Sequence, residues 1–375
     1  MVRDTATRPA LDGVAPGPAT GYASEGDESI EYDGSRIWLS RFVDAAADRL
    51  PYGPVVAGTV ALGWPPLALG GVVLAGLIDT ATPAFLASFA LTAGLLTAFP
   101  VLIWYYDARV LTRFAGRMRE RVADEDALAD TAATYERRFA RRYPMVVVPW
   151  TILLLGVVAV SLPTFAAQGI AGVGDPLFWA VAAFFCWGGL LTGIGFHGAL
   201  TTVGYLRTLV DRTILSIDPY HPDGLGGMSS VGYFAIRTTL LLSTGALLLP
   251  FAFQLAAGTP FESPIYLAVA LYVGVIAGSF AYPTWLVNRS ADEVRVEHLD
   301  ALGSEITALQ QDLAATPGHD VDDVGTLLEL QRLQQLYDDY RATRLYPMSP
   351  SILSQLVASV LLPIVMLGLE SVVLG

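Results

Sequence analysis

One polar segment separates two long apolar runs of the chain, SIDPYHPDGLGGMSSVG at residues 216–232. Asp218, His221 and Asp223 supply two carboxylates and an imidazole, groups that bind divalent cations or transfer protons. The prolines and glycines around them are typical of a sharp turn, which aspartate side chains also stabilise. No second histidine or cysteine lies nearby. Two interpretations stay open, a metal or proton site and a structural turn, and the composition favours the turn.

A second candidate is His197, in the sequence GIGFHGALT within an apolar run. Ionisable groups inside a membrane are costly and are often functional. Gly193, Gly195 and Gly198 would let a neighbouring helix approach closely. The histidine is therefore interpreted either as a neutral side chain hydrogen-bonded across helices or as a polar intramembrane site.

The last apolar run, residues 350–374, carries four polar side chains that are candidates for a site. Ser354, Gln355 and Ser359 are candidates to line a water-filled path, and Glu370 lies near the end of the run. In a symmetric oligomer, Glu370 would form a ring of carboxylates that attracts cations. The alternative is an interfacial residue without a function.

The runs that must position these residues are long and apolar. The chain is 53% hydrophobic and only 15% charged, below the roughly 25% of an ordinary soluble domain. A run of about 20 apolar residues crosses a bilayer as a helix. We therefore predict an all-α polytopic membrane bundle, formed by residues 51–375, with seven transmembrane helices at 54–78, 83–105, 146–168, 176–205, 232–256, 264–287 and 350–374.

The arginines predict how these spans are oriented. All of the 22 basic residues are arginines, and each falls before the first span or in an even-numbered connection, except Arg237, which lies near the cytoplasmic end of the fifth span. The other connections are short, and their only charged residues are Asp79, Asp175 and Glu262. Because basic residues stay on the cytoplasmic side, we expect a cytoplasmic N-terminus and an extracellular C-terminus in the cell membrane.

The absence of lysine excludes several kinds of chemistry. Retinal and pyridoxal phosphate attach through a lysine Schiff base, and the Walker phosphate loop also requires lysine. We expect no enzymatic activity, no cofactor and no nucleic-acid partner. The single cysteine, Cys186, excludes an intrachain disulfide and is predicted to be a small buried side chain. Together with a net charge of −13, the missing lysine makes the composition similar to that of salt-loving archaea.

The remaining segments are expected on the cytoplasmic side. Residues 1–35 predict a disordered acidic tail without a signal peptide, and 36–50 predict an interfacial amphipathic helix. Residues 107–143 are expected to form a helical pair. Residues 290–345 predict a helical hairpin, because leucines recur at spacings of three and four on both sides of Thr316-Pro317-Gly318.

This predicted arrangement resembles the seven-helix ligand-gated ion channel superfamily that includes insect odorant and gustatory receptors. The shared features are seven spans, the expected orientation, short external loops and long helical cytoplasmic extensions. The resemblance implies a tetramer in which 204–231 and 288–349 form a cytoplasmic anchor and 350–374 lines a cation pore. The family's Thr-Tyr…Gln-Phe signature is absent from SPSILSQLVASVLLPIVMLGLE. The segments HPDGLGG and YPMSP…LLP are similar to segments of prokaryotic multi-pass membrane proteins.

We therefore expect a homo-oligomeric cation channel or sensor in contact with the lipid bilayer, whose ion or small ligand the sequence does not identify. A small-solute transporter with a site near His197 and Pro250 is an alternative. A scaffold or signalling subunit that acts through the 290–345 hairpin is another. A membrane-embedded enzyme using Asp218, His221 and Asp223 is the weakest, because no nucleophile accompanies them.

Overall fold

The computed structural model describes residues 37–119, 125–212, 218, 220–221, 223, 226–260, 262–315, 321–343 and 350–369. The tail predicted at 1–35 and the candidate Glu370 lie outside these residues. The described residues belong to one compact unit, Tyr32–Gly375. They form helices and turns and contain no strand, which confirms the all-α prediction for this part of the chain.

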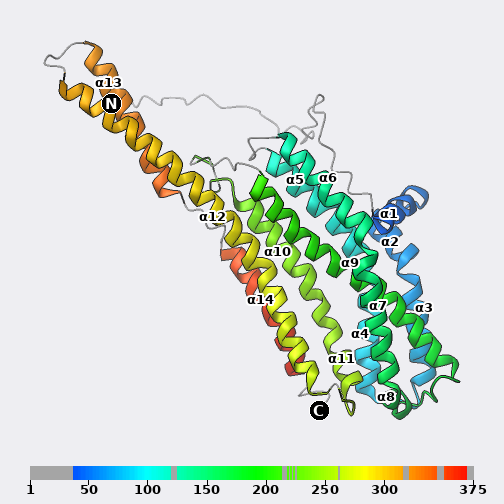
Figure 1. Cartoon of the computed structure of the whole chain (residues 1–375). Coiled ribbons are helices and arrows are strands. Elements are labelled where there is room, and N and C mark those ends of the chain that lie inside the picture. Colours follow the sequence, from blue (N-terminus) through cyan, green and yellow to red (C-terminus); the bar gives the residue numbers. More distant parts are fainter. Residues whose placement is uncertain are drawn as a thin grey trace, which may run out of the picture. The chain divides into compact units, whose positions relative to one another are not determined.

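Figure 1 shows the helices and their labels. In chain order the elements are α1 (Trp38–Arg49), α2 (Pro54–Leu62), α3 (Trp64–Leu77), α4 (Pro83–Tyr105), the π-helix η2 (Tyr106–Leu111), α5 (Thr112–Arg119), α6 (Glu125–Arg142), α7 (Pro144–Val160), α8 (Leu162–Ala167), α9 (Pro176–Arg212), α10 (Ser229–Thr244), the 3₁₀-helix η3 (Gly245–Leu248), α11 (Leu249–Ala256), α12 (Pro264–Ala315), α13 (Val321–Ala342) and α14 (Pro350–Leu369).

Several helical segments are long and apolar enough to cross a bilayer. Five meet this test among the described residues, namely Pro83–Arg119, Ala129–Val160, Pro176–Val210, Ser229–Ala256 and Pro264–Ala314. The pair α2 and α3 makes a sixth if both helices belong to one span. The described apolar part of α14, Ile352–Met366, is shorter. The helices are therefore compatible with an integral membrane protein, and the predicted count of seven spans stays a prediction.

The first apolar run is not one straight helix. The axes of α2 and α3 differ by 50° at Gly63. Pro65 and Pro66 follow directly in the first turn of α3, where proline lacks the backbone N–H needed to continue the preceding helix. Gly63 also lies against α4, since a Cβ atom there would be 2.7 Å from the carbonyl oxygen of Thr97. The sequence WPP thus bends the segment where it passes closest to α4.

The core is built around α9, which contacts α3, α4, α6, α7 and α12. Phenylalanines fill the space between α4, α9 and α11. The ring of Phe89 lies 4.9 Å from that of Phe184 and 5.1 Å from that of Phe251, between ring centroids. Cys186 lies on an exposed part of α9, so its prediction as a buried side chain is wrong. The face of α9 that carries Phe184 is buried instead.

Helix α1 is held against the bundle by its polar residues as well as its apolar ones. Leu39 and Val43 are fully buried. The Ser40 hydroxyl donates a hydrogen bond to Asp107 in η2 (2.7 Å), and Trp104 Nε1 donates to Asp44 (2.7 Å). These contacts fix α1 along the end of the span that contains η2.

Helix α12 extends far beyond the length that a bilayer requires. Its 52 residues begin with an apolar segment and continue without a break into a charged one. Helix α13 packs along the charged part, so the two form a hairpin that is visible in Figure 1. On α13, Leu333 is buried, and Leu330 and Leu336 are partly buried. The apolar seam predicted on α12 is partly buried at each of its positions, namely Leu299, Leu302, Ile306, Leu309 and Leu313.

Candidate functional site

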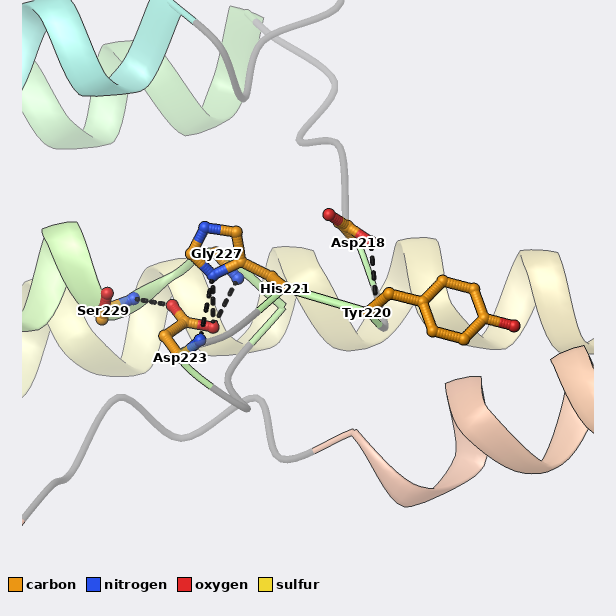
Figure 2. Close-up of polar contacts among 6 residues, drawn as sticks. All are labelled: Asp218, Tyr220, His221, Asp223, Gly227 and Ser229. Carbon is orange, nitrogen blue, oxygen red and sulfur yellow. Dashed lines mark hydrogen bonds and ion pairs between the residues drawn. The ribbon is translucent and has the colours of Figure 1, made fainter. Parts of the chain in front are cut away.

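The described residues between Asp218 and Ser229 form a hydrogen-bonded turn at the start of α10 (Figure 2). The Asp218 carboxylate accepts a hydrogen bond from the backbone N–H of Tyr220 (3.0 Å). The Asp218 backbone carbonyl accepts one from the N–H of His221 (3.1 Å), and its N–H donates to the carbonyl of Gly226 (3.3 Å). These bonds close the turn with backbone groups on both sides.

Asp223 joins this turn to α10. Its Oδ1 accepts a hydrogen bond from the N–H of Gly227 (3.1 Å) and its Oδ2 accepts one from the N–H of Ser229 (3.2 Å). The first N–H groups of a helix have no intrahelical acceptor, and a carboxylate there also interacts favourably with the helix dipole. Gly226 and Gly227 have φ angles of +65° and +88°, which glycine adopts without strain. The carboxylate therefore acts as the N-terminal cap of α10.

His221 supports the same carboxylate. Its Nδ1 lies 2.7 Å from Asp223 Oδ1 and also 3.3 Å from the backbone nitrogen of Asp223. A single Nδ1 atom cannot donate to the carboxylate and accept from the N–H at once. We assign the proton to Nδ1, because the 2.7 Å contact is the shorter one and involves a charged acceptor. In this assignment His221 donates a hydrogen bond to the Asp223 carboxylate, and both side chains stabilise the turn.

The described residues contain no group of three or more histidine, cysteine, aspartate or glutamate side chains placed to hold a metal ion. Asp218 turns toward the backbone of Tyr220, whereas His221 and Asp223 turn toward α10 (Figure 2). The geometry thus favours the turn interpretation of this segment over the metal interpretation.

The turn has a second set of contacts, with the α12–α13 hairpin. Interaction with the carboxylate of Asp339 on α13 raises the pKa of the Tyr220 phenol. The pKa of Tyr340 is raised by burial and then by the negative charge of Asp218. The ring of Tyr340 stacks on His298 of α12, with 5.5 Å between ring centroids. The turn therefore caps α10 and interacts with residues of α13, which in turn packs on α12.

Arg295 ties the two helices of the hairpin to each other at this level. Its guanidinium pairs with Asp292 on α12 and donates to the backbone carbonyl of Thr343, which follows α13 (3.3 Å). We call the set formed by Asp218, Tyr220, Arg295, His298, Asp339 and Tyr340 the hairpin junction.

His197 lies inside the bundle, apart from the hairpin junction. It is 5% exposed and stacks on Phe139 of α6, with 5.5 Å between ring centroids. Its Nε2 is buried and has no hydrogen-bond partner among the described residues. A Cβ atom at Gly198 would be 3.3 Å from the Phe139 ring, so the glycine permits this close approach. His197 therefore packs across helices by ring stacking, and both interpretations of this residue stay predictions.

The candidates on α14 do not form one group. Ser354 and Gln355 are exposed in the single chain. Ser359 is buried, and its hydroxyl donates to the carbonyl of Leu356 (2.8 Å). Helix α14 packs against α10 and α12. Two of the three described candidates therefore lie on the exposed surface of the single chain, and the third faces the bundle.

Sequence reasoning missed a buried polar group at η2. Asp107 is 2% exposed, although the sequence places it at the beginning of an extramembrane segment. The neighbouring Tyr106 hydroxyl lies 2.7 Å from the Thr238 hydroxyl and 3.2 Å from that of Thr202, so it connects α9 and α10. The sequence feature that could have indicated this buried group is Asp107, the acidic residue in YYDARVL. A π-helix, which often marks a functional position, cannot be recognised from that sequence.

Comparison with protein families, curated proteins and solved structures found no match for this chain.

Proposed function

We propose that the protein is an oligomeric membrane sensor or signalling subunit in which the α12–α13 hairpin joins copies and reports on the state of the bundle. The observation that carries the proposal is the continuity of α12, which runs as one helix from its apolar segment into the hairpin. A continuous helix transmits a displacement along its axis through its backbone hydrogen bonds, of which Pro283 removes one within the apolar segment.

The hairpin junction supplies a second connection between bundle and hairpin. Tyr220 and Asp218 belong to the turn that caps α10, and their partners Asp339 and Tyr340 belong to α13. A shift of α10 would therefore move the base of the hairpin even if α12 stayed in place. A sensor requires an element whose position depends on several parts of the molecule. The hairpin is such an element, because both α12 and α10 influence its position.

The hairpin also has an apolar surface that suits a second copy of the chain. Val324, Leu327 and Leu328 on α13 are 56%, 53% and 62% exposed. The surrounding sequence, VDDVGTLLELQRLQQLYDDYRA, is too charged to lie in hydrocarbon, so lipid would not cover these side chains. Association through the same surface on two copies would bury them with twofold symmetry.

The proposed orientation places the hairpin, α5 and α6 in the cytoplasm and the end of the chain outside the cell. It is supported by the arginines, which precede the first predicted span, lie in alternate connections or, for Arg237, lie near the expected cytoplasmic end of a span. Cysteine accessibility in intact cells tests it, with Cys186 first replaced by serine. A cysteine at Gly303 should then be protected from an impermeant reagent.

The oligomer is tested by adding charge to the exposed surface of α13. Leu327→Glu with Leu328→Glu should shift the full-length protein in detergent from an oligomer to a monomer, measured by light scattering after size exclusion. Gln331→Glu with Gln334→Glu adds the same charge at exposed positions of the same helix and should leave the oligomer intact. Equal masses for the two double variants would contradict the proposal.

A cation path along α14 is a second candidate function. It is supported by the exposure of Ser354 and Gln355 on an otherwise apolar helix, since polar side chains facing lipid are costly. It is also consistent with the resemblance to the seven-helix channels. Gln355→Leu should reduce cation flux through protein reconstituted in liposomes, and Glu370→Gln should change the cation selectivity. Leu353→Ala, at another exposed position, serves as the control. Absence of flux under every ligand, voltage and salt condition would reject the path but not the oligomer.

A further inference from the structure

A hollow of about 180 Å³ lies between α5, the end of η2 and the start of α10. Its floor is apolar and its rim carries three guanidinium groups, a hydroxyl and a phenol. The lining residues are Val110, Arg113, Phe114, Arg117, Ser230, Tyr233, Phe234 and Arg237. This site is separate from the hairpin junction, with which it shares no residue.

The helical register explains why the basic groups gather here. Arg113 and Arg117 are one turn apart on α5, and Tyr233 and Arg237 are one turn apart on α10. Residues four apart on a helix project from the same face. Since α5 and α10 are in contact, the two rows border one hollow from opposite sides.

The floor fixes the distance between the two rows. Phe114 of α5 stacks on Phe234 of α10 with 4.0 Å between ring centroids and 10° between ring planes. Both rings are buried, at 3% and 2% exposure. The positions from which the three arginines project are thus set by a packed aromatic contact rather than by the arginines themselves.

The charge of this hollow is uncompensated within the described part of the chain. No carboxylate lines it, and none of the three arginines forms an ion pair with another described residue. The chain as a whole has a net charge of −13, so a local excess of positive charge is contrary to the average composition. Guanidinium groups placed together in this way repel one another, and a bound anion removes the repulsion.

We propose that this hollow binds a phosphate group, presented either by the headgroup of an anionic phospholipid or by a soluble phosphate compound. Guanidinium matches phosphate through paired N–H···O bonds, and the exposed Tyr233 hydroxyl supplies a further donor. The hollow lies beside the first turns of Ser229–Ala256, a segment able to cross a bilayer, so a lipid headgroup can reach it.

The experiment compares the full-length protein with Arg113→Gln and Arg237→Gln combined, one change from each row. The matched control combines Arg332→Gln and Arg341→Gln, which removes two exposed arginines from α13. One arm measures phosphatidylglycerol bound to the protein by native mass spectrometry, with phosphatidylcholine for comparison. The other arm measures binding of inorganic phosphate and ATP by calorimetry. Size exclusion verifies that each variant is folded.

Each arginine near an anionic surface contributes a factor of roughly five, so the double variant should bind its phosphate ligand roughly 20-fold or more weakly. Loss confined to phosphatidylglycerol identifies a lipid headgroup, and loss confined to phosphate or ATP identifies a soluble ligand. Arg113→Lys with Arg237→Lys keeps the charge and should restore only part of the binding, because lysine lacks the paired donors. Binding that is the same in the double variant and the α13 control in both arms would overturn the proposal.

Discussion

Removing the carboxylate of Asp223 tests whether the polar segment is a structural turn. Asp223→Ala deletes two acceptors, which bond the N–H groups of Gly227 and Ser229, and the partner of His221. The carboxylate is largely buried, with 13% of its side chain exposed. Solvent will therefore replace these bonds only in part.

The magnitude follows from the two lost bonds. Loss of an N-cap costs about 1 kcal/mol, and a hydrogen bond to a charged group contributes about 1.5–3 kcal/mol. We expect the free energy of local opening at the start of α10 to fall by about 2–3 kcal/mol. Since about 1.4 kcal/mol corresponds to a tenfold change, amide exchange at Gly227 and Ser229 should accelerate roughly 30- to 150-fold.

Hydrogen–deuterium exchange with mass spectrometry of a peptide covering 226–232 measures this effect in the full-length protein. Asp300→Ala, which removes an exposed carboxylate from α12, is the control and should leave that peptide unchanged. Asp223→Asn retains one acceptor oxygen and should give a smaller acceleration. Two results would refute the reasoning. One is unchanged exchange in Asp223→Ala. The other is protection of the peptide by added Zn²⁺ or Mn²⁺ in the wild type but not in Asp223→Ala, which would establish a metal site.

Two further predictions concern other parts of the structure. The pKa of Tyr220 is raised by its interaction with Asp339, so the neutral phenol is favoured in the folded protein. This interaction contributes stability below the ordinary tyrosine pKa of about 10. The contribution is lost as the pH rises through the higher pKa of the folded state. The tyrosinate absorbance of the wild type minus that of Tyr220→Phe should therefore titrate above about pH 10, and Asp339→Asn should lower that midpoint; an unchanged midpoint would show that the interaction is absent. Gly63→Ala should destabilise the protein by about 1–3 kcal/mol, because the new Cβ atom would lie 2.5 Å from the Thr59 carbonyl oxygen. Thermal unfolding in detergent measures this, with Gly71→Ala, which meets nothing within 4 Å, as the control that should not unfold earlier.

The helices and the hairpin could be predicted from the sequence because they depend on local patterns. An apolar run and a leucine spacing of three and four are properties of neighbouring residues, and they placed helices at α4, α9, α12 and α13. The turn at 218–229 was also expected, since proline, glycine and aspartate restrict or stabilise the nearby backbone whatever the rest of the fold does.

The partners of these elements depended on the tertiary structure. No local pattern indicates that Tyr220 interacts with Asp339, far along the chain, or that Arg113 and Arg237 border the same hollow. The sequence placed Asp107 at the start of a polar segment. In the structure it is a buried hydrogen-bond acceptor, because α1 packs over it and supplies the Ser40 hydroxyl. The sequence by itself determined which segments are helical and apolar. Only packing decided which side chains meet, since contacts between distant residues depend on how whole helices fit together.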